Sequence, residues 1–149
     1  MLNVKKILVP TDFSKSSDAA LKKAGEIAEA FNSELILLHV IPEQSNVLYS
    51  YLGSKASKEL KEKLKKETEE MFKKQVEDVL GDKKIKIDTI IKFGEPYHEI
   101  LKLEEDLDVN LVVIASHTKS FFEDVFFGST TEKVVRRSKK SVLVVRELQ

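Results

Sequence analysis

Three short segments carry residue types suited to holding an anion or a metal ion. Pro10-Thr11-Asp12 comes at the end of an apolar run, residues 6–10, which predicts a buried strand ended by the proline. Ala115-Ser116-His117-Thr118 comes at the end of a second apolar run in the same way. Gly128-Ser129-Thr130 precedes a helical pattern and supplies a glycine, two hydroxyls and the N–H groups of a helix N-terminus. That last combination favours an anion such as phosphate.

Simpler structural roles explain the same residues. Gly128 can make a turn and Ser129 can cap the helix, and caps are commoner than ligand sites. Asp12 is the one natural carboxylate for Mg²⁺ or for a general base, but it is equally a helix cap. His117 can hydrogen-bond a ligand or lie exposed in a loop, and His39 at a strand end is expected to be structural. No catalytic residue is assigned.

Several catalytic and binding motifs are absent from the sequence. The histidines are not spaced as zinc ligands, and no Ser-His-Asp arrangement is readable. Neither GxxxxGK[ST] nor GxGxxG occurs, which argues against a P-loop nucleotide hydrolase and a dinucleotide-binding domain. The lack of cysteine excludes disulfides, thiolate nucleophiles and zinc–thiolate sites.

The composition is that of one globular domain, expected over residues 1–149, with a highly charged surface. The 149 residues are 42% hydrophobic and 34% charged. Lys+Arg and Asp+Glu both number 25, so the net charge is zero and a surface for nucleic acid or for a membrane is not expected. No apolar run approaches the ~20 residues of a membrane span, and the N-terminus has no signal-peptide pattern. We therefore expect a cytoplasmic protein.

Strand and helix patterns alternate along the chain. Apolar runs predict strands over residues 6–10, 34–40, 85–92, 111–116 and 141–145. Apolar residues at helical spacing predict helices over residues 14–31, 55–80, 97–106 and 130–138, with a loop over residues 44–54. Five strands with four long connections imply a parallel sheet with helices on both faces. Ligands of such sheets bind beyond the C-terminal ends of the strands, where the strand order reverses.

Several stretches together resemble the universal stress protein family. The family's first strand and acidic turn are similar to KILVPTDFS, the end of its second strand to LHV, and its entry to the third helix to KFGEPYHEIL. Its C-terminal signature is similar in order and spacing to LVVIASHTKSFFEDVFFGSTTEKVVRRSKKSVLVVR. The resemblance covers essentially the whole chain. It implies a three-layer α/β sandwich, adenine nucleotide alpha hydrolase-like, with a five-stranded parallel sheet in the order 3-2-1-4-5.

The nucleotide motif of that family is partly replaced. ATP-binding members carry Gly-x2-Gly-x9-Gly-Ser/Thr, and these positions hold Ala115, Thr118, Gly128 and Ser129 here. Side chains at the first two positions obstruct close approach of the backbone to phosphate, and the β-branch of Thr118 disfavours a positive φ. The Thr118 hydroxyl is, conversely, a donor for phosphate. Asp124 stands where the family often has a basic residue.

The resemblance implies a site for ATP or ADP, with Asp12 on the side of Mg²⁺ or of the ribose and the adenine at the backbone of Val40. The candidate nucleotide-binding residues are Pro10, Thr11, Asp12, Val40, Ala115, Ser116, His117, Thr118, Gly128, Ser129 and Thr130. A stress-response binding module is the function that this site implies. Two alternatives stay open: a nucleotide-free member that acts through dimer and protein contacts, and a weak Mg-dependent ATPase.

Two further segments are candidate contact surfaces. The last strand is expected at a sheet edge, where pairing with the same strand of a second copy would cover it. Its residues are Ser141, Val142, Leu143, Val144 and Val145. Family members dimerise in this way, so the resemblance implies a homodimer. The loop containing Phe121, Phe122, Phe126 and Phe127 either packs into the core or forms an exposed lid or partner surface.

Overall fold

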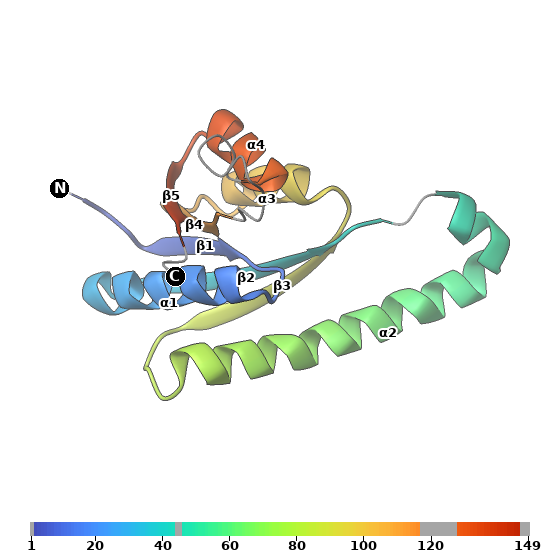
Figure 1. Ribbon diagram of the computed structural model, residues 1–149, viewed down its shortest axis with the longest axis horizontal. Helices are drawn as coiled ribbons and strands as arrows, with labels where there is room; N and C mark the ends of the chain where they lie inside the picture. Colours follow the sequence, from blue (N-terminus) through green and yellow to red (C-terminus); the bar gives the residue numbers. More distant parts are fainter. Residues whose placement is uncertain (1, 44–45, 117–127, 147–149) are drawn as a thin grey trace.

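The chain alternates strands and helices throughout (Figure 1). The computed structural model describes residues 2–43, 46–116 and 128–146. In chain order the elements are β1 (Lys6–Pro10), α1 (Lys15–Phe31), β2 (Glu34–Ile41), α2 (Asn46–Leu80), β3 (Ile87–Phe93), α3 (Pro96–Asp106), β4 (Leu111–Ala115), α4 (Ser129–Arg137) and β5 (Ser141–Val145). None of the helices within these ranges combines the length and apolar character of a bilayer-spanning segment.

The strands form one parallel sheet in the order β3-β2-β1-β4-β5. α1 and α2 cover one face of this sheet, and α3 and α4 cover the other (Figure 1). The predicted three-layer α/β sandwich and its strand order are confirmed. β3 and β5 form the two edges of the sheet, as the implied strand order requires and as was expected for the last strand.

β1 runs through the centre of the sheet and is buried on both faces. Ile7 and Val9 pack on the side of α1 and α2, whereas Leu8 packs on the side of α3 and α4. This alternation follows from the two-residue period of a strand. Burial on both faces also explains why the residues after Lys6 in KILVP are continuously apolar rather than alternating.

β1 and β4 are the neighbouring strands at which the winding of the chain reverses direction. β1 pairs with β2 along its whole length from Lys6 to Pro10, whereas its register with β4 covers Ile7 and Leu8 in the described chain. The two strands therefore share little pairing toward their C-terminal ends. A gap between backbone ladders at this point is where ligands of doubly wound sheets bind.

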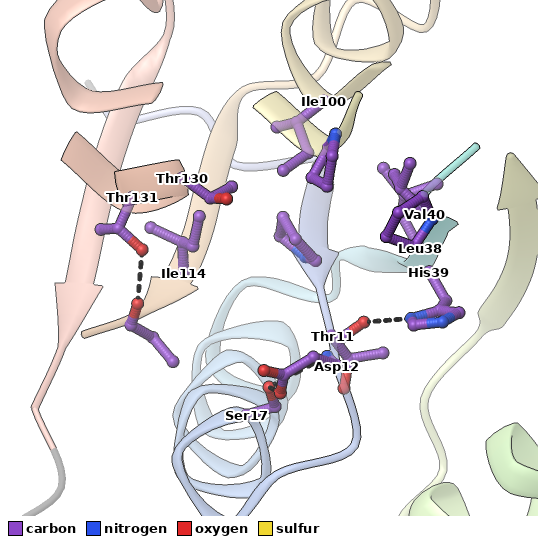
Figure 2. A pocket seen from close by; sticks show the side chains of 14 residues that line it. Thr11, Asp12, Ser17, Leu38, His39, Val40, Ile100, Ile114, Thr130 and Thr131 are labelled. Atoms are coloured by element: carbon purple, nitrogen blue, oxygen red, sulfur yellow. Dashed lines mark hydrogen bonds between the residues drawn. The ribbon is translucent and has the colours of Figure 1, made fainter. Parts of the chain in front are cut away.

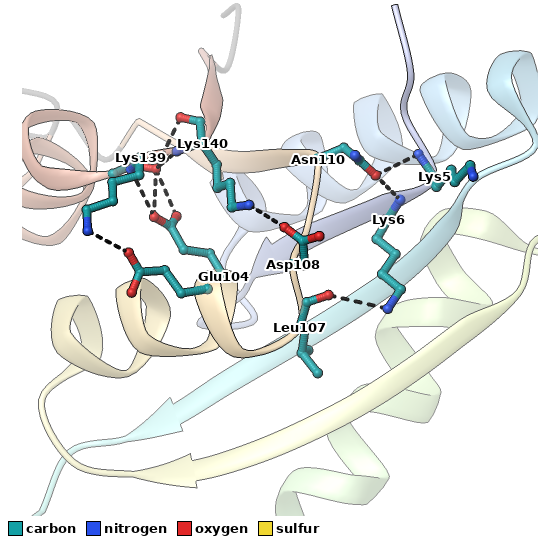
Figure 3. A network of polar contacts seen from close by, with 10 residues as sticks. Lys5, Lys6, Glu104, Leu107, Asp108, Asn110, Lys139 and Lys140 are labelled. Carbon is teal, nitrogen blue, oxygen red and sulfur yellow. Dashed lines mark hydrogen bonds and ion pairs between the residues drawn. The ribbon is translucent and has the colours of Figure 1, made fainter.

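Polar contacts close the opposite end of the β1–β4 junction (Figure 3). The side-chain oxygen of Asn110 accepts from the backbone N–H groups of Lys5 and Lys6 at 2.8 and 2.9 Å. The Lys6 ammonium donates to the carbonyl of Leu107 at 3.3 Å. The start of β1 is thereby held on the segment that leads into β4.

A buried carboxylate fixes the turn between α4 and β5. Glu104 is 1% exposed, and its two oxygens accept from the Ser138 hydroxyl at 2.8 and 2.9 Å. The Lys139 backbone N–H donates to the same carboxylate at 3.3 Å. Beside it, the Lys140 ammonium donates to Asp108 at 2.6 Å (Figure 3), and this bond lowers the pKa of the Asp108 carboxyl. These contacts hold the edge strand β5 on α3.

α1 begins and ends with capping residues. Ser14, rather than Asp12, occupies the N-cap position, where its hydroxyl accepts from the Ser17 N–H at 3.2 Å. Asn32 ends the helix in the left-handed conformation, with φ of 55°. α1 therefore starts directly after the loop that follows β1.

The predicted loop over residues 44–54 was wrong, because α2 already begins at Asn46. Gly53 interrupts the helix with φ of 76° and ψ of 167°, a conformation that favours glycine, so two helices meet at a kink. The part before the kink lies beyond the sheet (Figure 1), and Tyr51 in it is 86% exposed. A helical segment that does not pack on the core needs no apolar residues at helical spacing, so its sequence gives no pattern from which the helix can be predicted. The other predicted boundaries lie close to the observed ones.

Candidate functional site

A cavity of about 310 Å³ opens at the C-terminal ends of β1, β2 and β4 (Figure 2). The loop after β1, the end of β2, the start of α3 and the first turn of α4 complete its walls. Its lining residues are Pro10, Thr11, Asp12, Ser17, Leu38, His39, Val40, Pro42, Pro96, Ile100, Ile114, Ala115, Thr130 and Thr131. The volume is at the lower end of the range for small-molecule sites.

The structure brings together some of the predicted site residues and leaves others outside this lining. The predicted residues that line the cavity are Pro10, Thr11, Asp12, Val40, Ala115 and Thr130. Those described but outside the lining are Ser116, Gly128 and Ser129. The predictions that lie outside the described residues concern His117, Thr118, Asp124 and the four phenylalanines Phe121, Phe122, Phe126 and Phe127.

The loop after β1 is held by the end of β2. The Thr11 N–H donates to the Leu38 carbonyl at 2.8 Å, and His39 Nδ1 lies 2.7 Å from the Thr11 carbonyl oxygen (Figure 2). Because a carbonyl only accepts, His39 carries a proton on Nδ1. The His39 ring also lies against Phe13, with 4.8 Å between the ring centroids. His39 has the structural role predicted for it and lines the cavity as well.

Asp12 combines a structural contact with a place in the cavity lining. Its Oδ1 accepts from the Ser14 N–H at 3.0 Å and from the Ser17 hydroxyl at 2.5 Å. The Asp12 N–H donates to the Ser17 oxygen at 3.1 Å. The carboxylate is exposed, so these contacts orient it without removing it from solvent. Ser17, which the sequence did not single out, is therefore the residue that positions the one carboxylate of the lining.

The first turn of α4 is tied to the end of β4. The Thr131 hydroxyl donates to the Ala115 carbonyl at 2.7 Å, and both residues are buried (Figure 2). Gly128 is the N-cap of α4, with φ of 96° and no side-chain capping bond, and Ser129 is the first helical residue. The predicted capping role of Ser129 was therefore wrong. Because Gly128 has no side chain to accept from the first N–H groups of α4, an acceptor from a ligand could bind them.

One side of the cavity is apolar. Its residues are Leu38, Val40, Pro42, Pro96, Ile100 and Ile114. Of these, the sequence predicted only Val40, because the others are ordinary core or turn residues in any pattern. Pro96 and Ile100 reach the site from α3, and the Gly94-Glu95-Pro96 turn that follows β3 was the available signal.

The polar side of the cavity carries little charge. Asp12 is the one acidic residue in the lining, and no group of three His, Cys, Asp or Glu residues that could hold a metal ion occurs in the part of the chain that the structure describes. A protein-only metal centre is therefore not formed by these residues. A Mg²⁺ ion held jointly by one carboxylate and the phosphates of a ligand fits this donor set.

Comparison with known protein families shows which family the chain belongs to. The model of the universal stress protein family matches residues 3–146. The chain belongs to the universal stress protein family. Among its curated relatives in the family, universal stress protein MJ0577 of Methanocaldococcus jannaschii is 37% identical in an alignment 154 positions long that covers 95% of this chain and 94% of that protein. Universal stress protein YxiE of Bacillus subtilis is 32% identical and is covered to 98%.

Solved structures of universal stress proteins share the fold. MJ0577 superposes with a TM-score of 0.81 at 36% identity over 99% of both chains. UspA from Lactobacillus plantarum superposes with a TM-score of 0.78 at 25% identity, over 97% of this chain and 99% of that one. Two more distant members, at 22% and 17% identity with TM-scores of 0.68 and 0.63, were determined in complex with cAMP and with dAMP. At those identities the likeness shows the fold alone.

Proposed function

We propose that this universal stress protein binds an adenine nucleotide, ATP or ADP, in the cavity at the C-terminal ends of β1 and β4. The observation that carries the proposal is the convergence of Asp12, Val40 and Thr130 on one cavity at the point where the strand order reverses. Members of the same fold complexed with cAMP and dAMP support an adenine nucleotide as the ligand class.

The apolar side of the cavity suits a planar base. Val40 and Ile100 line this side and are 8% and 2% exposed, so the wall is made of packed apolar side chains. A few polar groups among apolar walls is the usual composition of a small-molecule site. Adenine at the backbone of Val40, as the family resemblance implies, would lie beside this apolar wall.

The opposite side suits phosphate. Thr130 and Thr131 lie in the first turn of α4, whose N-cap provides no side-chain acceptor. N–H groups and the positive end of the helix dipole favour an anion there. Ala115 replaces the first glycine of the family motif with one methyl group. Ala115 packs in the core cluster on the α1 and α2 side of the sheet, away from the wall that α3 and α4 form.

Asp12 is the residue that would hold Mg²⁺ together with the nucleotide phosphates. When bound, the ion would neutralise charge on the phosphates. The hydrogen bonds that Asp12 accepts from Ser14 and Ser17 fix the orientation of its carboxylate, so that a ligand oxygen is already in place. Mg²⁺ commonly takes one or two protein carboxylates and completes its shell with phosphate and water, which this lining permits.

We also propose a homodimer in which β5 pairs with the same strand of a second copy. β5 forms one edge of the sheet, and Leu143 in its centre is 36% exposed. An uncovered apolar edge favours association, and a two-fold axis lets both edges be satisfied at once.

Nucleotide binding is tested first on the protein as purified, by native mass spectrometry for a retained adenine nucleotide. Thermal melting with Mg-ATP and Mg-ADP follows. A ligand at 100 times its Kd stabilises by ~2.7 kcal/mol, which raises the Tm of a domain of this size by ~5–10 °C. Thr130→Tyr would fill the cavity and abolish the shift, whereas Thr89→Tyr, on exposed β3, would retain it. Absence of retained nucleotide and of any shift supports the nucleotide-free alternative.

A further inference from the structure

We infer that Gln75, in the C-terminal part of α2, is a positioning residue for the proposed nucleotide site and acts on it through Thr11. Gln75 does not line the cavity. It belongs to α2, which packs next to α1 on the same face of the sheet. The inference rests on the proposed function for its effect on binding, whereas the restraint on the loop is a property of the chain itself.

Gln75 uses both ends of its amide on the segment after β1. It is 5% exposed, its Oε1 accepts from the Thr11 hydroxyl at 3.0 Å, and its Nε2 donates to Asp18 Oδ1 at 2.8 Å. A buried amide without partners is costly, so these two bonds fix the side chain in one orientation. Gln75 therefore connects the residue after β1 with the first turn of α1.

Thr11 passes this restraint to the loop that carries Asp12. Its oxygen accepts from the Phe13 N–H at 3.0 Å while its proton goes to Gln75, so Gln75 determines how the hydroxyl is oriented. Phe13 has a φ of 64°, a left-handed conformation that is uncommon and costly for a bulky residue. Asp12 lies between these two restrained residues, and its carboxylate depends on the geometry that they keep.

A second contact from α2 supports the same loop. Phe72, one helical turn before Gln75, is 2% exposed and packs edge-on against Phe13 with 5.4 Å between ring centroids. An apolar side chain at position 75 would fill the space equally well. The amide is explained by what it bonds, because burying an amide without need is unfavourable.

Packing of α2 and the geometry of the cavity loop are therefore coupled. By linkage, a ligand that favours this loop conformation also stabilises α2 in its packed position to the same degree. A nucleotide is thus expected to slow amide exchange in α2 around Phe72 and Gln75, although neither residue lines the cavity.

The test compares Gln75→Met with a matched α2 variant, Val79→Ala, whose partly buried side chain packs in the same core cluster. In Gln75→Met, amide exchange at Phe13 is expected to rise at least about tenfold and the Kd for Mg-ADP about tenfold, the equivalent of one hydrogen bond. Val79→Ala is expected to lower the Tm while leaving both quantities unchanged. Combining Gln75→Glu with Asp18→Asn reverses the polarity of their bond, keeps an acceptor for Thr11, and is expected to restore the wild-type Kd.

The outcomes separate this inference from the proposed function. If wild-type protein binds no nucleotide but Gln75→Met still speeds Phe13 exchange, nucleotide binding is refuted and the loop restraint stands without a ligand role. If Phe13 exchange and the Kd are unchanged in Gln75→Met, the inference is overturned whether or not wild type binds. If Val79→Ala raises the Kd as much as Gln75→Met does, general loosening of α2 is responsible and Gln75 has no positioning role.

Discussion

Substitutions of Asp12 separate its structural contacts from its proposed contact with Mg²⁺. Its Oδ1 accepts from the Ser14 N–H at 3.0 Å and from the Ser17 hydroxyl at 2.5 Å. Asparagine keeps an oxygen at this position, so Asp12→Asn is expected to cost less than ~1 kcal/mol of folding stability. Asp12→Ala removes the oxygen that accepts both bonds and is expected to cost ~2 kcal/mol, as the loss of a strong cap does. That cost lowers the Tm of a domain of this size by ~4–8 °C.

Nucleotide binding by the same variants is expected to follow a different order. With Mg²⁺ present, Asp12→Asn loses an ionised ligand and is expected to weaken ATP binding by about tenfold or more. With EDTA in place of Mg²⁺, the substitution removes a negative charge near the phosphates and is expected to leave binding unchanged or make it tighter. A loss of affinity that occurs only when Mg²⁺ is present is the signature of a metal shared by protein and nucleotide.

Isothermal titration calorimetry with and without Mg²⁺, and urea unfolding of the same samples, measure both effects. Asp88→Asn, at an exposed position of β3, is the matched control and is expected to behave as wild type in every assay. An equal loss of affinity with and without Mg²⁺ in Asp12→Asn would refute the metal role. Full stability in Asp12→Ala would show that the contacts to Ser14 and Ser17 contribute nothing.

Three further predictions concern the walls and edges of the fold. Thr131→Val removes the 2.7 Å bond to the Ala115 carbonyl within the core and is expected to cost ~1–3 kcal/mol in urea unfolding; a cost near zero would show that another donor replaces it. Leu143→Lys places a charge at the centre of the β5 edge and is expected to convert a dimer to a monomer in light scattering, whereas an unchanged mass would exclude pairing through that edge. The bond from Lys140 lowers the pKa of the Asp108 carboxyl in the folded protein, so the pair stabilises above the unfolded pKa and this contribution is lost as pH falls through the folded pKa. Asp108→Asn is therefore expected to reduce the urea midpoint slightly near neutral pH and not in acid, and an equal change at both would contradict the electrostatic origin.

The fold was predictable because its strands are buried on both faces. Ile7–Val9 and Leu35–Leu38 are apolar without alternation, which is typical of strands in a parallel sheet with helices on both sides, and the long connections require crossovers. The start of α2 was not predictable in this way. Its first turns lie beyond the sheet, where no core imposes a period, and Gly53 interrupts the helix.

The candidate site was predictable where polar residues end a strand, and not where ordinary residues reach it from elsewhere. Thr11 and Asp12 are recognisable in the sequence as polar residues directly after an apolar run. Ile100 lines the cavity because α3 packs over that end of the sheet, which the sequence pattern does not indicate. The position of Gln75 in the sequence indicates a buried polar contact. It lies on the same helical stripe as Phe72 and Val76, and a polar residue on a buried stripe indicates a specific partner.

The short register between β1 and β4 has a consequence for how the molecule holds together. In the described chain, the backbone pairing of β1 with β4 and the hydrogen bonds of Asn110 lie toward the N-terminal ends of these two strands. They join the strands β3-β2-β1 to the strands β4-β5 at that end of the junction. A nucleotide bound at the C-terminal ends of β1 and β4 would contact both groups of strands and stabilise their association. Release of the nucleotide is then expected to speed amide exchange first at the C-terminal ends of β1 and β4, before the edge strands change. Faster exchange that begins at β3 instead would contradict this expectation.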